Sequence, residues 1–194
     1  MLGKLFESRN KRLARLEREA VDAWHASGRD GPAPALLVRT LLFELAARHD
    51  ASTAVITSVR DEGSIHGLPD RFARVVMCNA PDAALDRIGR GTLSLPHVEH
   101  RVGDAREIVS QTLFAADRPV VVVASAPREL AVGVVAEALR DPSARHSVIV
   151  DHARLFVAHL GEPDLTEIEE LARPAGFEFT ERNGLLAVTP RIRS

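Results

Sequence analysis

The chain has 194 residues, a formal net charge of −2 and 45% hydrophobic residues, enough for the core of one domain with or without a small appendage. The near-neutral charge argues against a nucleic-acid-binding surface. No apolar run approaches the roughly 18 residues that cross a bilayer, and a charged helix follows residues 1–9, so no signal peptide is expected. The single cysteine, Cys78, excludes an intramolecular disulfide and fits a reducing cytoplasm. We therefore expect a cytoplasmic protein without nucleic-acid or membrane partners.

Two residue types are scarce enough to exclude several chemistries. Lysine occurs only at Lys4 and Lys11, and tyrosine is absent. A phosphate-binding loop of the Walker type needs a lysine beside a glycine-rich turn, and no such lysine exists here. The scarcity of lysine also disfavours Schiff-base chemistry, and the absence of tyrosine disfavours tyrosine-based mechanisms.

The first 50 residues are expected to form a helical pair. Apolar residues recur at helical spacing over 9–26 and again over 35–49, and a glycine- and proline-rich break separates the two segments. Pro34 suits the start of the second helix, where its missing N–H costs nothing. We predict that residues 1–50 are an appendage, acting as a lid or a homodimer contact, and that residues 51–194 form the main domain.

From residue 51 onward, strand patterns alternate with helix patterns. Continuous apolar, β-branched runs predict strands buried on both faces of a parallel sheet, at 53–59, 73–78, 120–124 and 147–150, with a weaker strand at 97–102. Helical patterns occupy 82–89, 104–114, 128–140 and 165–173. Asn183-Gly184 between two apolar stretches predicts a closing hairpin of 177–181 and 185–189. The expected fold is α/β, a doubly wound and mostly parallel sheet with a C-terminal antiparallel hairpin.

Ligands of such sheets lie beyond the carboxyl ends of the strands, at the switch point of the strand order. The residues of interest therefore follow the predicted strands. They are residues 60–63, 79–82, 103–105, 125–128 and 151–154.

Taken in chain order, these segments resemble the class I S-adenosylmethionine-dependent methyltransferases, over about residues 53–190. Residues 73–88 (ARVVMCNAPDAALDRI) are similar to that family's second strand and helix, and residues 97–108 (HVEHRVGDAREI) to its third strand and "Gly-Asp-Ala" turn. Residues 120–125, 128–139 and 147–151 resemble the fourth strand, next helix and fifth strand. The "Gly-Phe" at Gly176-Phe177 and the strand at 185–188 resemble the closing pair.

The resemblance implies a seven-stranded sheet whose last strand is antiparallel, with S-adenosylmethionine lying across the ends of the first three strands. By matching position, Asn79 would face the ribose hydroxyls, and Asp104 with the Ala105 backbone would face the adenine. Gly63 is the glycine that remains of the cofactor loop, and the turn at Ser125 would line the pocket. His152, after the fifth strand, is the candidate general base for a small hydroxyl or amine substrate, because an unperturbed histidine titrates near neutrality.

Two positions depart from the family pattern. The first strand normally runs into a "Gly-x-Gly-x-Gly" turn, whereas residues 55–63 read VITSVRDEG and keep only Gly63. A Cβ at Val59 or Asp61 would crowd the close backbone approach that glycine permits. At Asn79 the family prefers a carboxylate, and an amide oxygen is a weaker acceptor for a hydroxyl.

Single residues also carry plainer interpretations. Asp104 can cap the following helix, alone or together with an adenine contact, and His152 can be an exposed histidine at a strand end. His97 and His100 are spaced so that they point to opposite faces of a strand, so no metal site is predicted there.

Three hypotheses follow. The chain is an active small-molecule methyltransferase with an atypical cofactor loop, or a methyltransferase-fold protein that has lost methylation and serves as a binding or regulatory subunit or an enzyme of different chemistry. The third is an unrelated α/β ligand-binding or sensor domain, because a fold alone does not fix function.

Overall fold

The computed structural model describes residues 35–57, 67–82, 85–86, 95–124, 128–141, 143, 145–150, 166–182 and 185–191, together with Glu19, Asp22 and Ala26. Its centre is a seven-stranded sheet in the order β3-β2-β1-β4-β5-β7-β6. The strands are β1 (Thr53–Ile56), β2 (Arg74–Cys78), β3 (Val98–Arg101), β4 (Val120–Ala124), β5 (Ser147–Val150), β6 (Phe177–Arg182) and β7 (Leu185–Pro190). Strands β1 to β5 are parallel, and β7 is antiparallel to both of its neighbours. The predicted fold class is confirmed.

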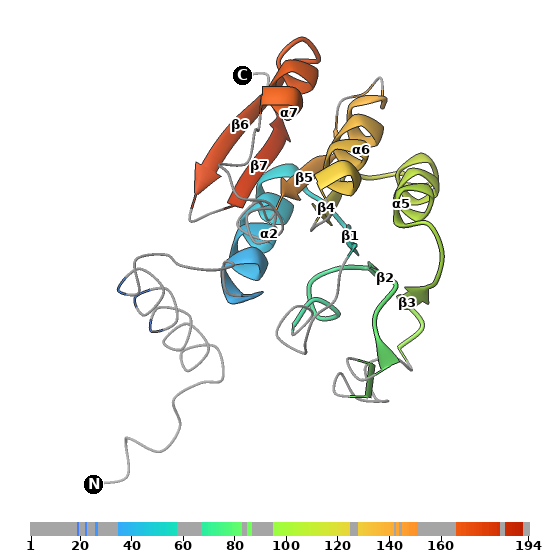
Figure 1. Cartoon of the computed structure of the whole chain (residues 1–194). Coiled ribbons are helices and arrows are strands. Elements are labelled where there is room, and N and C mark those ends of the chain that lie inside the picture. Colours follow the sequence, from blue (N-terminus) through green and yellow to red (C-terminus); the bar gives the residue numbers. More distant parts are fainter. Residues whose placement is uncertain are drawn as a thin grey trace, which may run out of the picture.

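Helices cover both faces of this sheet (Figure 1). On one face lies α2 (Ala35–His49), and on the other lie α5 (Ala105–Phe114), α6 (Arg128–Leu139) and α7 (Thr166–Ala172). This double cover explains why β4 is buried along its whole length. Successive side chains of a strand point to opposite faces, so Val121 and Val123 pack in the core on the α2 side while Val120 and Val122 pack on the α5–α6 side.

The second predicted helix, α2, packs against one face of the sheet. Leu37, Leu42 and Leu45 of α2 are buried in the same core cluster as Ala54 of β1 and Val121 of β4. The earlier residues of the proposed appendage lie outside the described residues, apart from the three named above. The domain division at residue 50 and a dimer contact through the N-terminal helices therefore stay predictions.

The first turn of α5 is bonded to α6 through Arg106, whose side chain passes over Gly133 of α6. Arg106 Nε donates to Glu137 Oε1 over 3.0 Å, and Arg140 Nη1 contacts the same oxygen at 2.9 Å. A Cβ on Gly133 would lie 3.1 Å from Arg106 Cδ, so the absence of a side chain there lets the arginine pass. This contact fixes the helix directly after Asp104.

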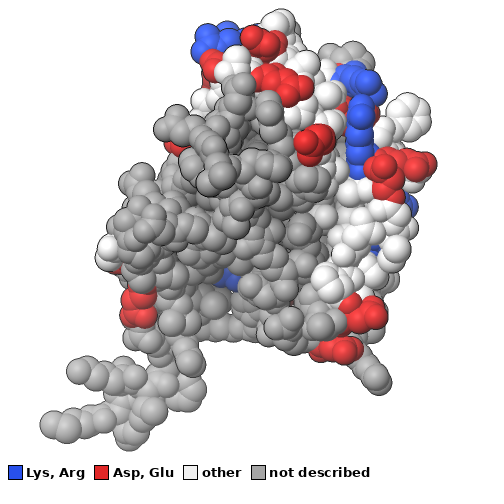
Figure 2. All heavy atoms as spheres, in the orientation of Figure 1, with Lys and Arg blue, Asp and Glu red and all other residues white. Residues whose placement is uncertain are grey.

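The surface formed by the described residues is mixed in charge. Figure 2 shows acidic and basic side chains interspersed over the described part of one face. None of the helices in the described ranges combines the length and the apolar character that crossing a membrane requires.

Candidate functional site

The candidate site lies where β1, β2 and β3 end. Because these strands are parallel, their carboxyl ends meet at one edge of the sheet, and the strand order reverses direction between β1 and β4. At this switch point Thr57 follows β1, is only 4% exposed, and donates its N–H to Val123 O over 3.0 Å. Thr57 was not singled out from the sequence, because the predicted strand of residues 53–59 ran past it, whereas β1 ends at Ile56.

Asn79 directly follows β2 and is bonded to the turn after β3. Its Nδ2 donates to Gly103 O over 2.7 Å, and its Oδ1 accepts from Gly103 N over 2.9 Å. Its backbone N–H also donates to Arg101 O over 2.9 Å. Asn79 has φ 48°, in the left-handed region that asparagine tolerates better than most side chains, and Gly103 has φ 148°, which favours glycine. The sequence motif placed both residues, but these bonds were not predicted.

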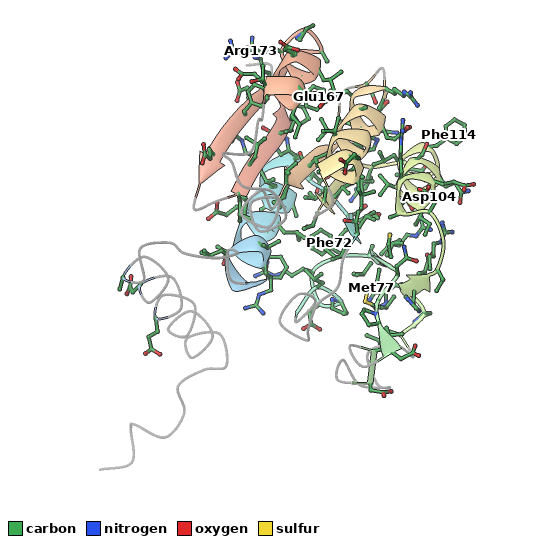
Figure 3. All side chains as sticks on the ribbon, in the orientation of Figure 1. Phe72, Met77, Asp104, Phe114, Glu167 and Arg173 are labelled. Carbon is green, nitrogen blue, oxygen red and sulfur yellow. The ribbon has the colours of Figure 1, made fainter. Side chains whose placement is uncertain are left out.

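Asp104 caps α5, in agreement with one of the two interpretations given for this residue from the sequence. Its backbone is extended (φ −64°, ψ 116°), and its Oδ1 accepts from Arg106 N over 2.8 Å and from Glu107 N over 3.1 Å. Within the described part of the chain, both of these side-chain bonds end on Oδ1. Asp104 is exposed and lies at the opposite end of α5 from Phe114 (Figure 3).

Ala105 is the first residue of α5 and its methyl group is buried against the sheet. The Asp104 cap takes the N–H groups of the second and third helical residues and not that of Ala105. The structure thus brings together Asn79, Asp104 and Ala105 of the predicted site residues. Gly63, Ser125 and His152, with the loop that lacks glycines, lie outside the described residues.

The thiol and the carboxylate beside this edge are held in unreactive protonation states, the thiol protonated and the carboxylate ionised. Burial raises the pKa of the Cys78 thiol to about 11, with Arg101 opposing, so Cys78 is a packing residue at neutral pH. Glu99 receives two bonds from Arg74, at 2.7 and 3.1 Å, and Arg101 lies 3.3 Å away. The bonds from Arg74 hold the pKa of Glu99 below its usual range, against the opposing effect of burial.

The two histidines near β3 have separate surroundings. His97 Nε2 lies 3.1 Å from Pro69 O, whereas His100 Nε2 is buried without a hydrogen-bond partner among the described residues. Within the part of the chain that the structure describes, no group of three or more histidine, cysteine or acidic side chains is arranged to hold a metal ion.

A hollow of about 550 Å³ opens at the other end of the sheet. It lies between the ends of α5 and α6 and the segment before β5, and Phe114, 94% exposed, is part of its lining. Its arginines are bonded within the chain. Arg145 donates to Asp117 O at 3.0 Å and Ala116 O at 2.8 Å, and Arg140 to Glu137. These bonds make the arginines structural.

His146 forms the buried wall of this hollow. It is 1% exposed, and its Nδ1 accepts from Val120 N over 3.1 Å. Its Nε2 lies 2.9 Å from Asp141 Oδ2, although the approach does not meet the geometry of a hydrogen bond. Burial lowers the pKa of His146 to about 4, outweighing the carboxylate of Asp141. The ring is therefore neutral and supports the start of β4.

The chain is similar to known proteins in its structure. No protein-family model and no curated protein sequence matches the chain. Among solved structures, a methyltransferase from Geobacter sulfurreducens is 15% identical, with a TM-score of 0.59 over 97% of this chain and 92% of its own. A protein from Corynebacterium glutamicum is 16% identical, with a TM-score of 0.56 over 92% of this chain and 90% of its own.

A proposed caffeoyl-CoA O-methyltransferase from Staphylococcus aureus is 13% identical, with a TM-score of 0.54 over 92% of this chain and 97% of its own. At identities this low, the similarity shows that the architecture is shared. It does not show that the activity is shared. The strand order, the antiparallel β7 and these similarities agree. The chain has the fold of the class I S-adenosylmethionine-dependent methyltransferases.

Proposed function

We propose that the chain is an S-adenosylmethionine-dependent methyltransferase that acts on a small molecule and binds its cofactor across the ends of β1, β2 and β3. The observation that carries this proposal is the turn between β3 and α5. Asp104 caps the helix through Oδ1 alone, which leaves Oδ2 outside the cap, and the cap does not use the Ala105 N–H.

An acceptor and a donor on consecutive residues match the edge of adenine, which offers an amino group beside a ring nitrogen acceptor. In the proposed complex, Asp104 Oδ2 accepts from the amino group and Ala105 N–H donates to the ring nitrogen. Asn79 lies beside the ribose, and Gly63 and Ser125 line the remainder of the cofactor pocket. The exposed position of Asp104 supports this assignment, because a ligand can reach it.

Bound S-adenosylmethionine supplies an electrophilic methyl group, so the task of the chain is to position the nucleophile and remove its proton. We assign proton removal to His152, which follows β5 in the sequence. A neutral imidazole can accept a proton from a hydroxyl or an amine near physiological pH.

Two observations favour a second candidate, a protein of this fold that no longer methylates. Residues 55–63 retain a single glycine in the cofactor loop, and both polar atoms of the Asn79 side chain are already bonded to Gly103. Such a protein would be a binding or regulatory subunit, or an enzyme of different chemistry.

Titration of the protein with S-adenosylmethionine and S-adenosylhomocysteine by calorimetry separates the two candidates. Saturable binding with a micromolar dissociation constant supports the first. No heat of binding at millimolar ligand contradicts it and favours the second. In that event Val59→Gly with Asp61→Gly gives a further distinction, because binding gained in this double variant shows that the loop is what lost the cofactor.

A further inference from the structure

The side chain of Asn79 is joined to a single residue 24 positions away in the sequence, through both of its polar atoms. One carboxamide meets the N–H and the C=O of Gly103, with distances of 2.9 and 2.7 Å. Two residues of an antiparallel ladder exchange a pair of bonds in the same way. The side chain thus extends the β2–β3 pairing beyond Arg101, the last residue of β3.

A carboxamide is suited to this pair of bonds, and an ionised carboxylate is not. The N–H of Gly103 needs an acceptor and its C=O needs a donor, and asparagine carries both. A carboxylate of the same length offers acceptors only, so it would keep the first bond and place a negative charge against Gly103 O. The left-handed backbone of Asn79 adds a second reason for asparagine at this position.

The bonded residue directly precedes the proposed adenine contacts. Only Val102, Gly103 and Asp104 separate β3 from α5, and Val102 is 80% exposed. Gly103 is therefore the point at which this turn is tied back to the end of β2. Its φ of 148° sets the direction in which the chain enters Asp104.

We infer that Asn79 is a positioning residue, whose carboxamide fixes the Gly103–Asp104 turn so that Asp104 and Ala105 face the adenine, and that it does not read the ribose hydroxyls. The bonds to Gly103 stand on the structure alone, whereas the role toward the ligand rests on the proposed function. A direct ribose contact and the positioning role predict opposite effects of one substitution.

The test uses three proteins and two ligands. Asn79→Asp creates a stronger, charged acceptor for hydroxyl groups but cannot donate to Gly103 O. Asn79→Gly removes both side-chain bonds while tolerating the left-handed backbone. Each protein is titrated with S-adenosylhomocysteine and with its 2′,3′-dideoxy analogue, which lacks the hydroxyl groups.

The positioning role predicts that both variants weaken binding about five- to tenfold, by the same factor for the two ligands, as the loss of one or two ordinary hydrogen bonds would do. Tighter binding of S-adenosylhomocysteine by Asn79→Asp would overturn the inference. A loss in Asn79→Gly that is confined to the ligand with hydroxyl groups would also overturn it, as would unchanged affinity in both variants.

Hydrogen exchange of the Gly103 amide, followed by NMR without ligand, tests the two bonds independently of the cofactor. We expect about tenfold faster exchange in Asn79→Gly than in the unaltered protein, because the amide loses its acceptor. An unchanged rate would refute the role of Asn79. If the unaltered protein binds neither ligand, the proposed function fails, and the exchange rate alone decides whether Asn79 holds the turn.

Discussion

Asp104 offers a prediction in which stability and ligand binding can be separated. Its Oδ1 accepts the N–H groups of Arg106 and Glu107, and Asp104→Ala leaves both without this acceptor. Loss of an N-terminal cap costs about 1 kcal/mol. In a domain of this size that corresponds to a melting temperature about 2–4 °C lower.

The proposed adenine contact uses the other oxygen, Oδ2. A hydrogen bond to a charged acceptor contributes about 1.5–3 kcal/mol, so its loss should weaken S-adenosylhomocysteine binding about ten- to a hundredfold. Asp104→Ser is the matched control. Serine caps helices as well as aspartate does, but it has no second carboxylate oxygen.

Thermal unfolding and calorimetric titration of both variants decide the matter. We expect Asp104→Ala to lose stability and binding, and Asp104→Ser to keep its melting temperature while losing binding. Unaltered affinity in Asp104→Ser would refute the adenine contact. A melting temperature unchanged in Asp104→Ala would refute the cap.

Two further predictions concern buried titratable groups. The fall of the His146 pKa from 6.5 to about 4 corresponds to about 3 kcal/mol of stability, which is present above pH 6.5 and is lost progressively as pH falls from 6.5 to 4, because the unfolded chain takes up the proton first. His146→Asn keeps an acceptor for Val120 N–H but cannot titrate. Its free energy of unfolding, measured with urea between pH 4.5 and 7.5, should therefore depend less on pH than that of the unaltered protein. Equal slopes for the two proteins would contradict this. Because burial raises the pKa of Cys78 from 9.0 to about 11, its thiol should react with Ellman's reagent at pH 8 at least about a hundredfold more slowly in the folded than in the unfolded protein. Rapid labelling of the folded protein would show that the thiol is accessible.

The elements of the sheet domain could be predicted because local pattern and tertiary environment agree. The leucines of residues 35–49 and the valines of residues 120–124 gave the bounds of α2 and β4 as the structure has them. Asn183-Gly184 predicted the pairing in which Arg182 lies opposite Leu185. In each case the signal lies within one segment, where periodicity reports it.

What could not be predicted depends on contacts between distant segments. The packing of α2 on the sheet follows from leucines that would suit any apolar partner. The bonds between Asn79 and Gly103 join residues whose proximity follows from the β2–β3 register. His146 has no local signal for burial, because its partner Val120 lies on β4, 26 positions away in the sequence. The resemblance pointed to Asn79, Asp104 and Ala105, which lie at one edge of the sheet, but it did not show which of their atoms are bonded to one another or to Gly103.

Hydrogen exchange measured by mass spectrometry, with and without saturating S-adenosylhomocysteine, tests most directly whether the cofactor binds across the ends of β1, β2 and β3. We predict slower exchange in peptides covering residues 77–80 and 101–108, where the second and third strands end and α5 begins. Protection confined to residues 110–114 and 140–146 would place the ligand in the hollow at the opposite end of the sheet. That result, or no protection anywhere at millimolar ligand, would contradict the proposed site.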